Sequence, residues 1–146
     1  MANTLGIHGT RILIIDDCCD TASTLCALFL MNGYKNAFWT TDKGAVACLG
    51  PAHEYDLILL DMLMPTISGI DLLHRLHFTQ PESCVPVIAM SGDQRYRTVA
   101  IQAGARAFLL KPFSQDELQA TISDVLFTHH GCCGKPDIDV AISRRL

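Results

Sequence analysis

Residues 55–61 read Tyr55-Asp56-Leu57-Ile58-Leu59-Leu60-Asp61, a short apolar run that ends in an acid. Its apolar residues follow one another rather than alternate with polar ones, which is typical of a strand buried on both faces of a parallel sheet. Three more runs of this form each end at a polar residue: 11–15 before Asp16, 85–90 before Ser91, and 105–110 before Lys111. With a weaker run over 35–40, the chain predicts five parallel strands.

Amphipathic stretches between these runs predict helices. Apolar residues recur at helical spacing within 22–30, 70–77, 93–104 and 114–126. Gly33 follows the first stretch as a stop signal, and Ser114 to Glu117 reads as a capping box at the start of the last. The strict alternation of five strands with five helices predicts an α/β fold with helices on both faces of the sheet.

The composition excludes several classes of protein. Of the 146 residues, 49% are hydrophobic and 18% are charged, which is too apolar for a disordered chain. The net charge of −4 argues against direct DNA binding through phosphates. No apolar run approaches the ~18 residues of a membrane span, and no signal peptide is visible. The odd number of cysteines, seven, without an export signal predicts reduced thiols and a cytoplasmic location.

Polar residues stand directly after the predicted strands. The carboxyl ends of parallel strands meet at one edge of the sheet, so these residues should share one cleft: Asp16, Asp17, Asp61, Ser91 and Lys111. Three carboxylates there would repel one another, and a divalent cation such as Mg²⁺ relieves the repulsion. With an ammonium and a hydroxyl beside them, the acids are suited to hold a phosphoryl group, and Asp61 is the natural nucleophile.

These motifs resemble the receiver domain of two-component response regulators, in particular the stand-alone, chemotaxis-regulator-like type. The resemblance covers 11–127 and is carried by Asp16-Asp17, Asp61-Met62-Leu63-Met64-Pro65 with Gly69, Ser91-Gly92, Phe108 and Lys111-Pro112. It implies a flavodoxin-like doubly wound sheet with strand order 2-1-3-4-5 and five helices. The chain is expected to have an N-terminal extension over 1–10, a receiver domain over 11–127 and, where the helix and strand pattern stops, a disordered C-terminal tail over 128–146.

The resemblance also implies a role for each site residue. Asp61 matches the phosphoacceptor, and Mg²⁺ would be bound by Asp17, by the backbone carbonyl of Leu63, by Asp61, and by Asp16 through water. Ser91 and Lys111 match the residues that contact the phosphoryl group, Ser91 and Phe108 match the switch pair, and the Lys111–Pro112 bond matches one that is cis. Because phenylalanine lacks the hydroxyl of the tyrosine in many relatives, its inward rotamer is expected to depend on packing alone.

The function implied is that of a single-domain response regulator, a signalling switch rather than an enzyme. A histidine kinase or a histidine phosphotransfer protein would supply the phosphoryl group, and the surface around the fourth helix, fifth strand and fifth helix would carry the output. The apolar Leu63 predicts slow self-hydrolysis of the aspartyl phosphate. The sequence names no downstream protein target and leaves a homodimer open.

Three alternatives belong to other classes. A degenerate receiver used as a docking module would not need the intact acidic set. An aspartyl phosphohydrolase would place a second acid where Leu63 stands, and a flavin carrier would not place acids at the phosphate loop. We interpret Cys18-Cys19 as residues of a loop-to-helix junction, and His129-His130-Gly131-Cys132-Cys133 as part of the tail.

Overall fold

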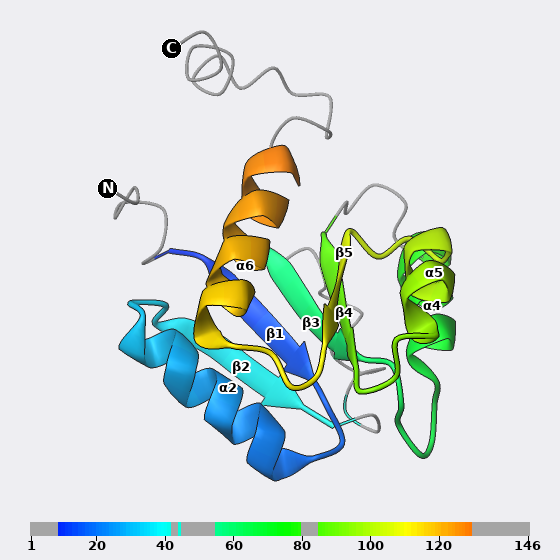
Figure 1. The fold of residues 1–146 in the computed structure, drawn as a ribbon, viewed down its shortest axis with the longest axis horizontal. Coiled ribbons are helices and arrows are strands. Elements are labelled where there is room, and N and C mark those ends of the chain that lie inside the picture. The colour runs from blue at the N-terminus through cyan, green and yellow to red at the C-terminus, as the bar shows by residue number, and fades with distance from the viewer. Residues whose placement is uncertain (1–8, 42–43, 45–54, 80–84, 130–146) are drawn as a thin grey trace, which may run out of the picture.

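The computed structural model describes residues 9–41, 44, 55–79 and 85–129, and places nine helices and strands among them (Figure 1). In chain order they are β1 (Arg11–Ile15), α2 (Cys19–Met31), β2 (Asn36–Thr40), β3 (Leu57–Asp61), α4 (Gly69–Thr79), β4 (Val87–Ser91), α5 (Tyr96–Gln102), β5 (Ala107–Leu110) and α6 (Gln115–His129).

The five strands form one parallel sheet in the order β2-β1-β3-β4-β5. This confirms the doubly wound topology and the strand order that the resemblance implied. In the register of the sheet, Ile15 pairs with Leu60, so Asp16 and Asp61 each follow directly after a paired residue. The sheet therefore brings two acids that are far apart in the sequence to one edge.

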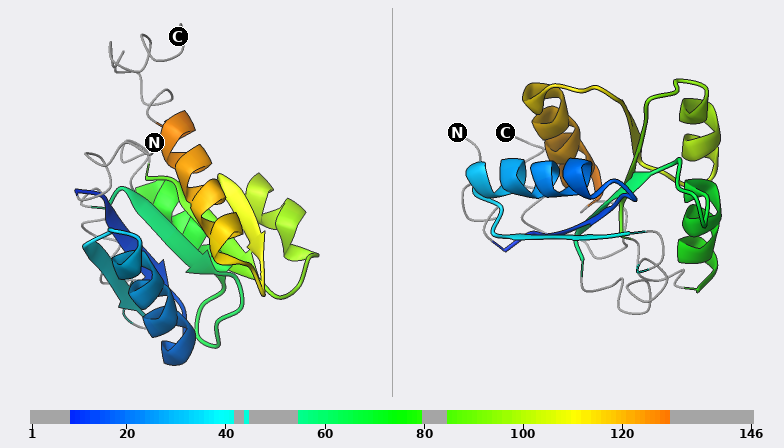
Figure 2. Two further views of the ribbon diagram at one scale, coloured as in Figure 1. Left: turned by 60° about the vertical axis from the view of Figure 1, so that its left-hand side comes forward. Right: turned by 90° about the horizontal axis from the view of Figure 1, so that it is seen from below.

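Two apolar cores lie on opposite faces of this sheet. Successive residues of each strand point to opposite faces of the sheet, and both faces are buried. The strands are therefore apolar at every position rather than at every second one. Ile12, Ile14 and Leu59 pack with α2 and α6, while Leu13, Ile15 and Leu60 pack with α4 and α5. The same division of the helices is visible in Figure 2.

The helix signals of the sequence appear in the structure with one difference. Ser114 and Glu117 exchange the two capping-box hydrogen bonds at 2.8 and 3.1 Å, and Gly33 has a φ of 91° just after α2 ends. The helix predicted over 93–104 begins only at Tyr96. Asp93 accounts for the difference, because its carboxylate accepts the backbone N–H of Arg95 at 2.9 Å and forms a turn instead.

Some predicted features lie outside the described residues, and one helix ends later than predicted. The helix expected between β2 and β3 lies largely outside the described residues, as do most of the N-terminal extension and of the tail. The last helix continues to His129, so Thr128 and His129, which were expected in the tail, belong to α6. Within the described part of the chain, no helix is both long enough and apolar enough to cross a bilayer.

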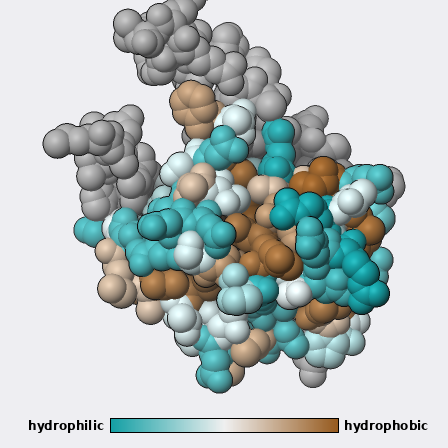
Figure 3. Space-filling model, in the orientation of Figure 1, coloured by the Kyte–Doolittle hydropathy of each residue, from teal (hydrophilic) through white to brown (hydrophobic). Residues whose placement is uncertain are grey.

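Some side chains exposed at the sheet's far edge are apolar. Val99 and Ile101 of α5 and Leu110 of β5 are exposed. Figure 3 shows hydrophobic surface between the α6 side and the α5 side of this face. The face expected to carry the output is therefore partly apolar.

Gly69 offers a test of how α4 packs beneath the site. A Cβ at Gly69 would lie 2.7 Å from the Cα of Met62 and 2.8 Å from the carbonyl oxygen of Asp61, both of them backbone atoms. We expect Gly69→Ala to lower the free energy of unfolding by about 1–3 kcal/mol, because the backbone must shift. Gly92→Ala is the matched control, since no atom lies within 4 Å of its Cβ position. Urea unfolding that gives the two variants equal stability would contradict this packing.

Candidate functional site

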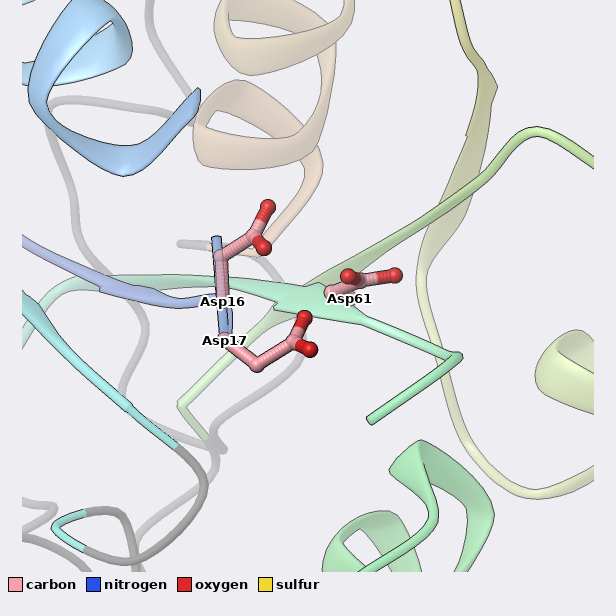
Figure 4. A group of neighbouring side chains, drawn as sticks. All are labelled: Asp16, Asp17 and Asp61. Carbon is pink, nitrogen blue, oxygen red and sulfur yellow. The ribbon is translucent and has the colours of Figure 1, made fainter. Parts of the chain in front are cut away.

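Three carboxylates gather at the carboxyl ends of β1 and β3. One oxygen each from Asp16, Asp17 and Asp61 lies within 4.8 Å of the others, and Figure 4 shows the three side chains around a common space. Asp16 is fully buried, Asp61 is 7% exposed and Asp17 is exposed. A set of hard oxygen ligands at this edge of the sheet suits Mg²⁺, which keeps several waters and needs few carboxylates.

Within the described part of the chain, the ammonium group of Lys111 is the one that contacts these acids. Lys111 Nζ lies 3.1 Å from Asp16 Oδ2 and 3.7 Å from Asp61 Oδ2. The backbone N–H of Lys111 donates to the carbonyl of Ser91 at 2.8 Å, and the Lys111–Pro112 peptide bond is cis, as the resemblance implied. The charge of Lys111 offsets only part of the negative charge of the three carboxylates, so a bound cation would stabilise the cluster further.

Burial raises the pKa of Asp61 to about 6. The backbone N–H of Leu63, 3.1 Å from Asp61 Oδ1, and the ammonium of Lys111 act in the opposite direction, while Asp16 raises the pKa further. The acid expected to be the nucleophile therefore gains its charge only near neutral pH when no cation compensates it. A bound cation would favour the ionised form, which is the form that can attack.

Asp16 has a more direct role than the sequence suggested. Its Oδ1 accepts the backbone N–H of Cys18 at 2.9 Å, and its Oδ2 accepts Lys111 Nζ. Asp16 thus holds Lys111 beside Asp61, in addition to any contact with a metal through water. Cys18 and Cys19 are exposed at the start of α2, in line with the junction interpretation, and hydrogen bonds from Thr21 lower the pKa of the Cys18 thiol.

Ser91 and Leu63 occupy the flanks of Asp61. Ser91 is 1% exposed at the end of β4, the strand next to β3, and its Oγ accepts the backbone N–H of Asp93 at 3.0 Å. The side chain of Leu63 is half-exposed, and the Leu63 backbone folds over the Asp61 carboxylate through the N–H contact. The structure thus brings the predicted residues of β1, β3, β4 and β5 to one edge.

The sequence interpretation missed two arginines. Arg95 pairs with Asp93 through Nε and Nη2 at 2.7–3.0 Å, and this contact lowers the pKa of Asp93. The guanidinium carbon of Arg97 lies 5.3 Å from the ring centroid of Phe108. The expectation that Phe108 depends on packing alone is therefore wrong. Exposed arginines at the start of a short helix carry no sequence signal for such contacts.

The comparisons with known proteins agree with this geometry. A family model described as the response regulator receiver domain matches residues 12–123, and the chain belongs to this family. Receiver domains bind Mg²⁺ at an acidic pocket, and this chain has an acidic cluster of the required kind. They are phosphoacceptor switches of two-component signalling, phosphorylated by histidine kinases or phosphotransfer proteins.

Among curated relatives, the cell cycle transcriptional regulator CtrA of Caulobacter vibrioides is 33% identical over 117 residues, which are 80% of this chain and 50% of CtrA. The transcriptional regulatory protein CpxR of Klebsiella pneumoniae is 33% identical over 120 residues, or 82% of this chain and 50% of CpxR. The chain thus spans about half the length of the curated relatives it matches.

Solved structures share the fold. The chemotaxis response regulator CheY4 of Vibrio cholerae has a TM-score of 0.69 at 20% identity, covering 80% of this chain and 98% of CheY4. The receiver domain of the sensor histidine kinase PA1611 from Pseudomonas aeruginosa has a TM-score of 0.66 at 25% identity, covering 81% of this chain and 98% of that domain. The PA1611 domain holds a magnesium ion in its active site cleft.

The raised pKa of Asp61 predicts a pH-dependent cost to stability. Folding raises this pKa from its ordinary value near 3.8 to about 6, so the stability that the protonated form contributes is lost as the pH rises through 6. Without divalent cations at pH 8, we expect the free energy of unfolding of Asp61→Asn to exceed that of the wild type by about 1–2 kcal/mol. The gain should vanish as the pH falls to 4 in urea unfolding.

The exposed acid Asp71 provides the control for removing one negative charge. Asp71→Asn should show no comparable gain at pH 8. An Asp61→Asn variant that is no more stable than the wild type at pH 8 would contradict a raised pKa.

Proposed function

We propose that this chain is a response regulator whose Asp61 accepts a phosphoryl group in a Mg²⁺-dependent reaction. The observation that carries the proposal is the convergence of three carboxylates within 4.8 Å, with the ammonium of Lys111 beside two of them. A histidine kinase or a histidine phosphotransfer protein is the proposed donor. The receiver is proposed to span 11–127 and to act as a single-domain regulator by contact with other proteins.

The proposed transfer is an in-line displacement at phosphorus. A carboxylate oxygen of Asp61 forms the new O–P bond, the P–N bond to the donor histidine breaks, and its electron pair stays on the imidazole. Lys111 is already next to Asp61, so its ammonium can contact a phosphoryl oxygen without crossing the cleft. Because Asp61 is only 7% exposed, the donor histidine can reach its carboxylate only at the small part that meets solvent.

Mg²⁺ would be held by Asp17, by Asp61, by the backbone carbonyl of Leu63 and, through water, by Asp16. When bound, the ion would offset the negative charge on the transferring phosphoryl oxygens. The exposed Asp17 is suited to direct ligation, whereas both oxygens of Asp16 already accept hydrogen bonds.

Phosphorylation would alter the contacts of Ser91. Its hydroxyl accepts the Asp93 N–H and retains its own proton to donate to a phosphoryl oxygen. Reversing a 1:99 population of two states requires about 5.5 kcal/mol. A few charge-assisted hydrogen bonds, at roughly 1.5–3 kcal/mol each, supply that amount. We propose that the change reaches Phe108 and the partly apolar face formed by α5, β5 and α6.

A phosphorylation assay tests the proposal. We expect acetyl phosphate with Mg²⁺ to add the mass of one phosphoryl group to the intact chain, and expect removal of Mg²⁺ by a chelator to prevent the addition. Asp61→Asn should abolish it and Asp71→Asn should not, because Asp71 is exposed on α4. No adduct on the wild type, or an adduct that persists in Asp61→Asn, would refute the role of Asp61.

The lifetime of the phosphorylated form is a second test. The apolar, half-exposed side chain of Leu63 stands beside Asp61 and cannot orient an attacking water, so we propose slow self-hydrolysis. Leu63→Asn should shorten the lifetime several-fold, whereas Leu63→Met, which stays apolar, should leave it close to the wild type. The rate is measured as loss of the mass adduct after the phosphodonor is removed, and equal rates in all three proteins would exclude this role.

A further inference from the structure

We propose that the outer edge of β2 is a homodimer interface, along which β2 of a second copy of this chain pairs in antiparallel orientation. The two five-stranded sheets would then form one continuous sheet. The inference goes beyond the proposed function, because it concerns the edge of the sheet farthest from β5 and uses no side chain of the acidic cluster.

The outer edge of β2 carries backbone groups that no described strand uses. β2 stands at one end of the strand order and pairs with β1 alone among the described strands (Figure 1). The carbonyl of Thr40 accepts the N–H of Asp16 at 3.1 Å, so Thr40 directs its backbone groups toward β1. Because successive residues of a strand direct these groups to opposite sides, those of Ala37 and Trp39 point to the outer edge. An edge of this kind is a template for another strand.

β2 has none of the features by which edge strands usually avoid such pairing. Its five residues, Asn36–Thr40, include no charged residue, no proline and no glycine. Proteins commonly place lysines, prolines or bulges at sheet edges to prevent association. Phe38 and Trp39 are 44% and 42% exposed, and Leu30 and Met31 at the end of the neighbouring α2 are exposed too. The edge therefore presents apolar, uncharged surface to a partner.

The ring of Phe38 is held in place while part of it stays exposed. The guanidinium carbon of Arg11 lies 5.7 Å from the ring centroid of Phe38 and 5.6 Å from that of Tyr55. The rings of Phe38 and Tyr55 meet edge to face, with their centroids 6.3 Å apart. An aromatic side chain that is fixed before association loses little conformational entropy, so Phe38 is suited to anchor an interface.

Two-fold symmetry selects a second copy of β2 as the partner. Hydrogen-bonded and non-hydrogen-bonded residue pairs alternate along an antiparallel pair of strands. If Phe38 faces Phe38 of the second copy, Ala37 faces Trp39 on either side of it, and these are the residues whose backbone groups point outward. Each of these two pairs then exchanges two hydrogen bonds, and the Phe38 rings meet in the closely spaced pair between them. One register thus satisfies both copies with the same residues, as a two-fold interface requires.

The dimer should be weak and should leave the acidic cluster accessible. Edges of five residues bury less surface than the ~1,200 Å² of a stable interface, so association should appear only at high protein concentration. Because the two β2 strands run antiparallel, the carboxyl ends of the two sheets lie at opposite ends of the dimer. Phosphorylation of Asp61 therefore does not require dissociation.

Sedimentation equilibrium of the full chain, with a thiol reductant present, tests the interface from about 5 µM to about 1 mM. We expect the average mass to rise from the 16.0 kDa of one chain toward twice that value. Because residue 38 faces itself across the two-fold axis, Phe38→Lys and Phe38→Glu should each raise the dissociation constant about tenfold or more by opposing like charges. An equimolar mixture of the two variants should associate again, since a lysine then faces a glutamate.

Val99→Lys is the matched control, because it places the same charge at an exposed apolar position of α5, near the other edge of the sheet. It should leave the association unchanged. Three outcomes would overturn the proposal: a wild type that stays monomeric throughout the range, loss of association in Val99→Lys but not in Phe38→Lys, or a mixture of the two Phe38 variants that does not associate.

A second measurement uses the wild type alone. Trp39 is the only tryptophan of the chain and in the proposed register lies beside Ala37 of the second copy. Its emission should shift to shorter wavelength, and its quenching by acrylamide should decrease, over the concentrations at which the mass rises. Unchanged emission during that rise would place the interface elsewhere and overturn the proposal. Neither readout involves the phosphoryl adduct, so failure of the dimer and failure of the proposed function are distinguished.

Discussion

Repulsion among Asp16, Asp17 and Asp61 is the constraint on which the site depends. One oxygen from each carboxylate lies within 4.8 Å of the others, and among the described residues the ammonium group of Lys111 contacts two of them. Burial and the neighbouring Asp16 raise the pKa of Asp61 to about 6, so the fold holds the proposed acceptor in an environment that disfavours its charge. Such an arrangement is suited to bind a divalent cation and then to accept a phosphoryl group whose charge the cation offsets.

The sheet makes this cluster possible because its two apolar faces fix the register. Alternate residues of β1 and β3 are buried under different helices, so a shift of one residue would place each side chain on the wrong face. The same register places Ser91 beside β3 and Lys111 just beyond β5. A turn held by Ser91 and Asp93 then leads into α5, whose Arg97 covers Phe108.

Much of the fold could be predicted from local patterns. Continuous apolar runs located the strands, and the capping box at Ser114 located the start of α6, because backbone hydrogen bonding and burial impose short-range periodicity. The start of α5 was misplaced, since the carboxylate of Asp93 competes with the helix for a backbone N–H. The pairing of Asp16 with Lys111 was not foreseen either, because these residues are far apart in the sequence and meet only when β1 and β5 occupy one sheet.

The sequence by itself determined that acids, a hydroxyl and a lysine would stand at the ends of buried parallel strands, and that these ends would share one edge. Only the tertiary structure decided which carboxylate holds the lysine, how far burial raises the pKa of Asp61, and that Arg97 rather than packing alone covers Phe108. The physical reason is one of range. Periodicity and capping arise from neighbours along the chain, whereas desolvation, ion pairing and cation–π contact depend on distances between side chains of separate elements.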